Sequence, residues 1–453
     1  MTINGLDWRR AAATWMILAL PVMGAERIRA FPGAEGFGAF SRGGRGGKVL
    51  FVTSLDDYVP GKDKPIPGTL RAACETKGPR IVVFRVSGTI GLKAHLAVAE
   101  PRITLAGQSA PGGGICLRNH GTSVSTNDVV IRHMRFRPGD AVGRALAKQG
   151  KDWSTDALSM GTGARDVIFD HCSTSWANDE VLSVSGAGIT DVTVQWCIIS
   201  ESLTASTHSK GKHGYGTLLR TNGKVTFHHN IYAHHSSRCP RPGTYGEGCI
   251  LLDFRNNLIY NGAGYSAADP VRMNYVGNAI KRPRGYAFSI GGQTTLMYVA
   301  GNVLLGGSEG REDNWDLIKN AKPANKRSQP FSVAPVATDP AEKAYERVLA
   351  TCGAILPKRD AVDARVIRSI REGKGDLVDT AEQVGGWPDL ERGVAPADAD
   401  RDGMPDAWEK RHGLDAACPK DGAKDGDGDG YTNIEEWLNG TDPTRGSSSG
   451  KGP

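Results

Sequence analysis

Three groups of charged residues in the middle of the chain have the side-chain types that a metal-assisted reaction on an acidic substrate requires. The groups supply carboxylates, then lysines and a histidine, then arginines: Asp156, Asp179 and Glu180; Lys210, Lys212 and His213; Arg238 and Arg241. Carboxylate oxygens are the ligands that Ca²⁺ prefers, and cationic side chains pair with the carboxylates of a substrate. Together the groups predict a calcium site beside a strip of positive charge.

An acidic stretch near the C-terminus carries two copies of a calcium-loop pattern. Oxygen ligands occupy positions 1, 3, 5, 9 and 12 of the first copy, with glycine at position 6: Asp398, Asp400, Asp402, Asp406 and Glu409, around Gly403. The second copy repeats this spacing: Asp425, Asp427, Asp429, Asn433 and Glu436, around Gly430. A sharp glycine turn among hard oxygen ligands is what an EF-hand-like loop requires. We therefore predict a tandem calcium-binding module at residues 396–443, in which calcium is structural.

A repeat indicates the elements that must bring the central groups together. A short β-branched phrase ends at seven related positions, at spacings of 38, 25, 33, 27, 21 and 24 residues: Met134, Cys172, Cys197, Asn230, Asn257, Asn278 and Asn302. Each copy is too short to bury its own apolar face, so the copies must stack as a solenoid. Because the copies read as strands, the predicted fold class is all-β, a right-handed parallel β-helix over residues 26–307.

The repeated positions form a predicted ladder inside this solenoid. An asparagine there can hydrogen-bond to the equivalent residue one rung away, which offsets the cost of burying its amide. Cys172 and Cys197 lie on neighbouring rungs, and the sequence leaves open whether they form a disulfide or fill the ladder as buried thiols. Counted from the ladder, Asp179 and Glu180 lie 7 and 8 residues on, and Arg238 lies 8 residues on. Equal offsets place these side chains on one face at successive heights.

At these residues the chain resembles the pectate lyase family of polysaccharide lyases. Three motifs between about residues 30 and 310 carry the resemblance: Asp156-Ala157-Leu158, Phe169-Asp170-His171-Cys172-Ser173 and the Arg-x-Pro of Arg238-Cys239-Pro240. The resemblance implies cleavage of de-esterified homogalacturonan by β-elimination. In the family, calcium binds the C6 carboxylate of a uronate and acidifies its C5 proton. An arginine removes that proton, and the glycosidic oxygen leaves.

The resemblance also implies roles for the cationic residues. Arg238 is the expected proton acceptor. Lys210 is the expected partner of the substrate carboxylate, with Lys212 as its alternative. Arg241 is an expected substrate clamp, and His213 an expected substrate-binding residue. An arginine base implies an alkaline activity optimum, because guanidinium keeps its proton at neutral pH.

The expected ligands of the catalytic calcium are Asp156 together with Asp179 or Glu180. The chain departs from the family pattern around them. Ser154 and Ser183 stand where many relatives carry acidic residues, and Gly243 stands where a second arginine is usual. The metal site is therefore expected to use Asp152 or Glu180 in their place, or to fill when the substrate supplies ligands.

Two other functions fit the same residues. A hydrolase on a similar β-helix, of the polygalacturonase kind, would place two or three carboxylates around the scissile bond, drawn from Asp156, Asp170, Asp179 and Glu180. A non-catalytic solenoid would bind polyuronates or act in adhesion.

The two ends of the chain differ from the repeats in composition and in sequence pattern. Arg9-Arg10, an apolar stretch over 11–20 and small residues up to Ala25 predict a secretory signal peptide at residues 1–25, so we expect a secreted protein, extracellular or periplasmic. No later segment is apolar enough to span a membrane. Residues 308–395 are predicted as an extension with helices at 340–349 and 361–370, packed on the solenoid. Residues 444–453 are predicted to be a disordered tail.

Charge is divided unevenly along the chain. The net charge is +6, yet residues 398–442 hold 13 acidic and 5 basic residues, which leaves +14 for the rest. A basic body suits a polyanion, and the sequence carries no nucleic-acid-binding motif. We therefore expect an acidic polysaccharide such as polygalacturonate as the partner of the solenoid, with Ca²⁺ as the cofactor. We expect a monomer, and whether the module also anchors the protein to a partner stays open.

Overall fold

The computed structural model of the chain describes Met1 and residues 27–306 and 314–446. The predicted signal peptide, apart from Met1, lies outside the described residues, as do the first residues of the predicted extension and most of the predicted tail. Within the described part, no helix is long and apolar enough to cross a membrane.

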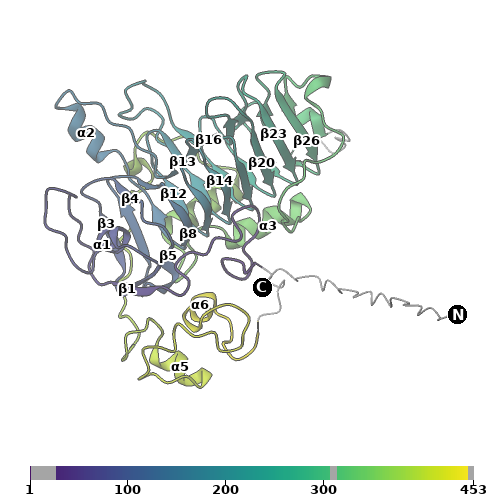
Figure 1. The fold of residues 1–453 in the computed structure, drawn as a ribbon. Helices are drawn as coiled ribbons and strands as arrows, with labels where there is room; N and C mark the ends of the chain where they lie inside the picture. Colours follow the sequence, from purple (N-terminus) through teal and green to yellow (C-terminus); the bar gives the residue numbers. More distant parts are fainter. Residues whose placement is uncertain (2–26, 307–313, 447–453) are drawn as a thin grey trace.

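The described chain winds as a coil whose successive turns add strands to three large parallel sheets, which contain ten, nine and six strands (Figure 1). The ten-stranded sheet contains β1 Lys48–Val52, β2 Arg80–Phe84, β5 Ile103–Ala106, β8 Asn127–Arg132, β11 Arg165–Asp170, β14 Thr190–Gln195, β17 Lys224–His228, β20 Ile250–Arg255, β23 Val271–Val276 and β26 Thr295–Ala300. The nine-stranded sheet contains β3 Gly88–Gly91, β6 Ile115–Arg118, β9 Arg135–Phe136, β12 Ser173–Ser175, β15 Ile198–Ser200, β18 Ile231–Ala233, β21 Leu258–Tyr260, β24 Ala279–Lys281 and β27 Val303–Leu305.

The third sheet has six strands, and it is the sheet on which the central charged residues lie. It contains β4 Leu96–Val98, β7 Thr122–Val124, β10 Leu158–Met160, β13 Glu180–Ser185, β16 Tyr215–Arg220 and β19 Arg241–Gly243. A short sheet of β22 Gly264–Tyr265, β25 Phe288–Ser289 and β28 Ile318–Lys319 follows towards the C-terminal end of the coil. All these pairings are parallel, so the predicted parallel β-helix is confirmed.

The core is a set of columns in which equivalent side chains lie one strand apart. Val129, Val167, Val192 and Val225 are register partners on successive strands, and all four are fully buried. Alternate residues of each strand point inward, so β-branched residues at these positions share one continuous core along the coil. The short helix α1 Leu70–Glu75 adds Leu70 and Cys74 to this core near the first turns.

The predicted ladder is present. Asn230, Asn257 and Asn278 are each fully buried, and the side-chain oxygen of each accepts the backbone N–H of the ladder residue one turn earlier at 2.9–3.0 Å. Cys172 and Cys197 extend the ladder as buried thiols, and all eight cysteines are free. The structure thus selects thiols from the two possibilities that the sequence left open.

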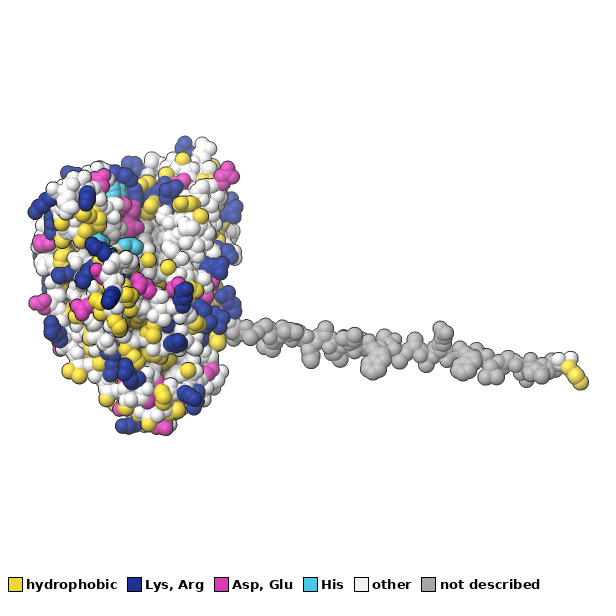
Figure 2. Space-filling model, turned by 60° about the vertical axis from the view of Figure 1, so that its left-hand side comes forward, with side chains coloured by type: hydrophobic (Ala, Val, Ile, Leu, Met, Phe, Trp, Pro, Cys, Tyr) yellow, Lys and Arg dark blue, Asp and Glu magenta, His cyan; other side chains and the backbone are white. Residues whose placement is uncertain are grey.

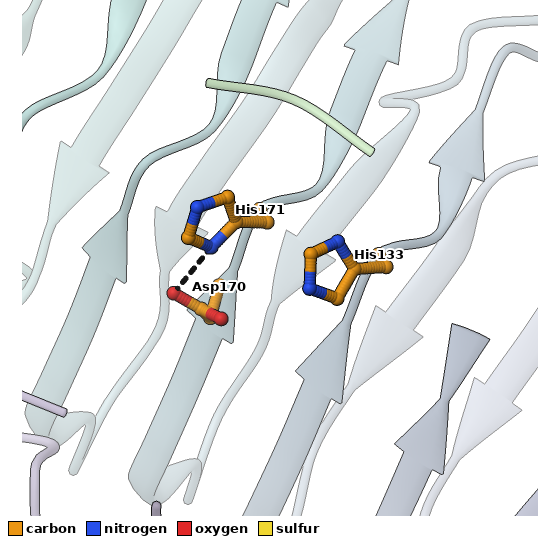
Figure 3. Close-up of side chains that lie close together, drawn as sticks. All are labelled: His133, Asp170 and His171. Carbon is orange, nitrogen blue, oxygen red and sulfur yellow. Dashed lines mark ion pairs between the residues drawn. The ribbon is translucent and has the colours of Figure 1, made fainter. Parts of the chain in front are cut away.

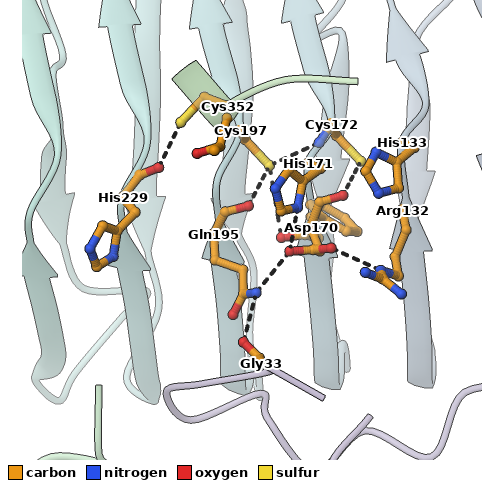
Figure 4. A network of polar contacts seen from close by, with 12 residues as sticks. Gly33, Arg132, His133, Asp170, His171, Cys172, Gln195, Cys197, His229 and Cys352 are labelled. Carbon is orange, nitrogen blue, oxygen red and sulfur yellow. Dashed lines mark hydrogen bonds and ion pairs between the residues drawn. The ribbon is translucent and has the colours of Figure 1, made fainter. Parts of the chain in front are cut away.

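Residues just before the ladder turn the chain sharply from the ten-stranded to the nine-stranded sheet. His133, His171, Trp196 and His229 each have φ between 50° and 54°, and their rings stack in sequence at centroid distances of 4.9, 6.0 and 4.2 Å. Figure 4 shows His133, His171 and His229 of this row beside Cys352, whose thiol donates to the carbonyl of His229 at 2.9 Å.

Asp170 lies at the centre of a polar network beside this row (Figures 3 and 4). Its carboxylate contacts Arg132 Nε at 2.8 Å, Gln195 Nε2 at 2.8 Å and His171 Nδ1 at 2.9 Å. Burial alone would raise the pKa of Asp170, but His171 and Arg132 lower it well below its usual range. Burial holds the pKa of His133 well below its usual range. The network therefore braces adjacent turns of the coil.

The chain beyond residue 313 covers two parts of the solenoid. Helices α3 Ala341–Thr351 and α4 Ala361–Glu372 pack Val348 and Val366 against the nine-stranded sheet at Ile198 and Ile231. Helices α5 Asp406–His412 and α6 Asn433–Asn439 lie beside β1 at one end of the coil (Figure 1). The remaining short helices are α2 Ala141–Ala147 and the 3₁₀ turns η1 Gly107–Ser109, η2 Asn314–Leu317, η3 Pro323–Asn325 and η4 Ala381–Val384.

Candidate active site and calcium loops

The central charged residues lie at the starts of neighbouring strands of the six-stranded sheet. Asp156 lies two residues before β10, Glu180 begins β13, and Tyr215 begins β16 directly beside Glu180 in the register. Ser237 pairs with Tyr215 on the other side, which places Arg238 next in the row. The shared face inferred from equal offsets along the repeat is therefore confirmed for Glu180 and Arg238, which form an ion pair. In the space-filling view, acidic, basic and histidine side chains gather along a hollow of the molecule (Figure 2).

Three carboxylates meet at one end of this row. Asp156, Asp179 and Glu180 each offer an oxygen within 4.8 Å of the others. The Glu180 backbone N–H donates to Asp156 Oδ1 at 3.1 Å, and the Ser183 hydroxyl donates to Asp156 Oδ2. Burial raises the pKa of Asp156 to about 7, and the negative charge of Asp179 adds to the rise. A set of hard oxygens this close together fits a divalent cation such as Ca²⁺.

Arg238 lies directly beside the carboxylates. Its guanidinium forms an ion pair with Glu180 and lies over the ring of Tyr215, with 4.1 Å between Cζ and the ring centroid. Arg238 has a φ of 62°, in the left-handed region, and its carbonyl accepts the N–H of Thr217 at 2.7 Å. The backbone contact and the aromatic face fix the side chain next to Glu180.

Arg241 begins β19 three residues after Arg238 and explains one departure from the family pattern. Its guanidinium pairs with Asp269 at 2.8 Å. A Cβ atom at Gly243 would lie 2.1 Å from Arg241 Nη1 and 2.7 Å from Asp269 Oδ2. Glycine at residue 243 therefore leaves the space that the Arg241–Asp269 pair fills, and any larger residue there would displace it.

Two histidines hold Asp179. His213 Nε2 lies 2.8 Å from Asp179 Oδ1, and His208 Nε2 lies 3.6 Å from Asp179 Oδ2. The two imidazole rings are parallel, with centroids 3.9 Å apart. Burial opposes ionisation of Asp179, but the hydrogen bond from His213 lowers its pKa overall. The sequence does not predict this role of His208, because no strand period or ligand spacing marks it.

Lys210 and Lys212 do not join the cluster. Both are exposed on the loop between β15 and β16, and neither side chain forms an ion pair with another described residue. The backbone N–H of Lys210 instead donates to His208 Nδ1 at 3.1 Å. Asp170 is also far from this role: it belongs to the ten-stranded sheet, and its carboxylate is engaged by three side chains.

The first C-terminal loop gathers most of its expected ligands and one that sequence analysis missed. Asp400, Asp402 and Glu409 lie with Asp421, all four offering oxygens within 4.8 Å of one another. Burial raises the pKa of Glu409 to about 8, and the charges of Asp402 and Asp400 add to the rise. Two other expected ligands are engaged elsewhere. Asp398 Oδ2 lies 3.4 Å from Arg85 Nη1, and the side chain of Asp406 accepts the N–H of Ala399 at 2.7 Å.

The second loop forms a cluster of its own. Asp425, Asp427 and Asp429 offer oxygens within 4.8 Å of one another. Glu436 is buried, and neither of its carboxylate oxygens has a hydrogen-bond partner among the described residues. Burial raises the pKa of Glu436 to about 7, with the charges of Asp429 and Asp427 adding to the rise. Buried, unpartnered carboxylate oxygens facing other acids are the donor set that a calcium loop presents.

Comparison with known proteins places the chain in a family. No protein-family model matches it. A probable pectate lyase C of Emericella nidulans is 33% identical over 432 residues, which cover 91% of this chain and 92% of the relative. A probable pectate lyase C of Aspergillus flavus is 34% identical over 434 residues, which cover 92% and 94%. The solved structure of jun a 1, the major allergen of cedar pollen, is 19% identical over 71% of this chain and 92% of its own, with a TM-score of 0.49. Because it shares about a third of its residues with relatives matched over most of their length, the chain belongs to the pectate lyase family and is a polysaccharide lyase.

Proposed function

We propose that this pectate lyase is secreted and calcium-dependent, and that it cleaves de-esterified homogalacturonan by β-elimination with Arg238 as the base. The observation that carries the proposal is the row on the six-stranded sheet in which Asp156, Asp179 and Glu180 meet beside Arg238. The three carboxylates that would bind calcium thus lie next to Arg238, the group that would remove the C5 proton of a uronate.

Each residue of the row has a task in this proposal. Asp156, Asp179 and Glu180 would hold calcium, which when bound draws electrons from the uronate carboxylate and makes the C5 proton more acidic. Arg238 then accepts the C5 proton, electrons move to form the C4–C5 double bond, and the O4 glycosidic oxygen leaves. The ring of Tyr215 packs against one face of the Arg238 guanidinium and helps to hold it in place. Arg241 is suited to pair with a neighbouring uronate, and Lys210 or Lys212 would have to reach the substrate from its exposed loop.

Geometry argues against the hydrolase alternative. That alternative would draw its carboxylates from Asp156, Asp170, Asp179 and Glu180, but Asp170 lies on another sheet within a saturated network. The remaining three carboxylates form one cluster within 4.8 Å and do not stand on opposite sides of a space for water, as an inverting hydrolase requires. Membership of a lyase family supports the same conclusion.

We also propose that the C-terminal module binds calcium through two loops and that residues 1–25 direct export. Glu409 and Glu436 support the first point, because both are buried with unpartnered carboxylate oxygens. The basic residues and apolar run at the start of the sequence support the second. Analysis of the N-terminal residue of protein recovered outside the cell would test export, with a start near residue 26 expected.

Polygalacturonate digestion with and without EDTA is the experiment that tests the main proposal. We expect ultraviolet absorbance from the conjugated double bond of the unsaturated product, its loss in EDTA and its return when calcium is restored. Reducing ends that accumulate without this absorbance would show hydrolysis and overturn the elimination mechanism. Unchanged absorbance in EDTA would overturn calcium dependence.

A further inference from the structure

The acidic cluster of the first C-terminal loop contains a carboxylate from outside that loop. Asp421 follows Glu409 by 12 residues, yet its oxygen lies within 4.8 Å of ligand oxygens from Asp400, Asp402 and Glu409. Glu409 is fully buried, and neither of its carboxylate oxygens has a hydrogen-bond partner among the described residues. Asp421 Oδ1, Asp402 Oδ2 and Asp400 Oδ2 are likewise buried and unpartnered. Buried carboxylates that face one another in this way must be neutralised, either by bound protons or by a cation.

The backbone around Asp421 is shaped to bring it to this cluster. The N–H of Asp415 donates to Asp421 Oδ2 at 3.3 Å, and the Asn433 side-chain amide donates to the Asp421 carbonyl at 2.9 Å. A Cβ atom at Gly422 would lie 2.5 Å from Asp402 Oδ2, so only glycine allows the two segments to approach this closely. The N–H of Ile434 donates to the Gly422 carbonyl at 3.0 Å. Asp421 therefore connects the first cluster to the start of α6, which belongs to the second loop.

The same segments carry the residues that attach the module to the solenoid. Met404, Ile434 and Leu438 are buried against Ile81 and Val83 on β2. Met404 is two residues after Asp402, and its N–H donates to Asp402 Oδ1 at 2.9 Å. At Asp402 and Met404, a proposed ligand and an apolar contact with the solenoid are thus only two residues apart.

Polar contacts surround this apolar patch. Arg45 pairs with Glu435 at 2.9 Å, and Arg85 pairs with Asp398 at 3.4 Å. The Arg132 guanidinium donates to Asn439 Oδ1 at 2.9 Å. The first strands of the ten-stranded sheet are therefore joined to both loops of the module.

We propose that Asp421 completes a calcium site with Asp400, Asp402 and Glu409, and that this ion holds the module closed on the first strands of the solenoid. The inference rests on the calcium loops proposed above and adds a ligand and a role. Without the ion, repulsion among the four carboxylates separates the segment of Asp421 from the loop of Asp402. Met404 and Ile434 then lose their fixed positions over β2, and the apolar outer face of that strand is exposed.

Calcium titration of the full chain by isothermal calorimetry tests the ligand. The variants are D421N and E409Q, with D442N as a control that removes a module charge outside both clusters. The D156N variant lacks a proposed ligand of the catalytic calcium, so the heat that it loses identifies binding at the catalytic site. We expect D421N and E409Q each to weaken one module ion by about tenfold or more, since even indirect changes around a metal have effects of that size. D442N should titrate like the unmodified chain. A D421N titration equal to that of D442N would overturn the role of Asp421.

Hydrogen exchange tests the attachment to the solenoid. We expect calcium to slow amide exchange in β1 and β2 of the unmodified chain and of D442N, and to have little effect there in E409Q. E409Q should also be at least as resistant to heat as the unmodified chain in EDTA, because it removes repulsion, and less resistant in calcium. This reversal separates loss of a ligand from a folding defect. Exchange in β1 and β2 that ignores calcium would overturn the attachment. A chain with no module titration at all would instead overturn the calcium loops themselves.

Discussion

Without bound calcium, the charged form of Asp156 is destabilised by burial and by the nearby charge of Asp179. Its pKa is raised from an ordinary 3.8 to about 7, first by burial and then by Asp179. Between these two values the native state keeps a proton that the unfolded chain has lost, so stability falls as pH rises through this window. Above about pH 7 the penalty is fully present.

The first prediction follows from this loss of stability as the pH rises. In EDTA, D156N should unfold at a temperature several degrees above the unmodified chain at pH 8, and at about the same temperature at pH 4. Asparagine keeps an acceptor for the Glu180 N–H and a polar partner for Ser183. Thermal unfolding at the two pH values measures the difference. An equal difference at both would show that the charge of Asp156 is not its source.

Arg238 gives the second prediction. R238K should lower kcat by at least about 100-fold, because lysine has neither the reach nor the planar geometry of the proposed base. The matched control is R220K, an exposed arginine of the same sheet that lies over Tyr245. Initial rates of unsaturated product at saturating calcium measure both variants. R238K activity within a few-fold of R220K would assign the base to another residue.

Residue by residue, the site could be predicted where it follows the repeat. Glu180 and Arg238 have equal offsets from the ladder, and the structure brings them together across β16, at the start of β13 and just before β19. Asp156 is expected from the family resemblance. His208, Asp421 and the Arg85–Asp398 pair could not be found in this way. Their positions depend on how loops between or beyond the strands fold back, and no period in the sequence records that.

At the scale of elements, the asparagine ladder fixes the turn between the ten-stranded and nine-stranded sheets. Asn257 Oδ1 accepts both the backbone and side-chain N–H of Asn230 at 3.0 Å, and its own amide donates to the Phe227 carbonyl at 2.9 Å. All these groups lie where water has no access. Each turn is thereby tied to the ones on either side of it.

The third prediction concerns this ladder. N257A should lower the free energy of unfolding by about 3 kcal/mol or more, because the Asn230 N–H and the Phe227 carbonyl lose buried partners. N222A, at an exposed loop asparagine that bonds to Tyr245 and Glu247 carbonyls, should cost less than about 1 kcal/mol. Urea unfolding of both variants in the presence of calcium measures the costs. If both variants lost a similar free energy of unfolding, the ladder would contribute no more to stability than an exposed loop asparagine.

The repeat predicted the coil and its ladder but not the row of stacked rings at its turns. A two-residue strand period and recurrent asparagines are local signals, and they identified the rungs and their approximate ends. The stack of His133, His171, Trp196 and His229 was not foreseen, because nothing in the sequence marks these positions as left-handed turns at which the rings meet. Cys352 reaches this row from a segment more than a hundred residues away.

For the whole molecule, the uneven distribution of charge suits two kinds of partner, a polyanion for the basic part and cations for the acidic segment. The segment 398–442 carries −8, and the rest of the chain carries +14. Seven acids of that segment gather in two clusters, and Asp402, Glu409 and Asp421 of the first cluster are buried. Lys210 and Lys212, by contrast, are exposed near the row of site residues. A polyanionic substrate is therefore attracted to the body over distances longer than a single contact.

Salt should weaken this attraction without changing the chemical step, which is the fourth prediction. Raising NaCl from about 0.05 to about 0.5 M shortens the screening length severalfold. The KM for polygalacturonate should rise several-fold while kcat stays nearly constant, with calcium held at saturation. Trigalacturonate, with only three carboxylates, should show a smaller rise because fewer charges act together. Initial rates over both substrates measure this. A fall in kcat at constant KM would mean that salt acts on the ion pair of Arg238 and Glu180 and not on the approach of the polymer.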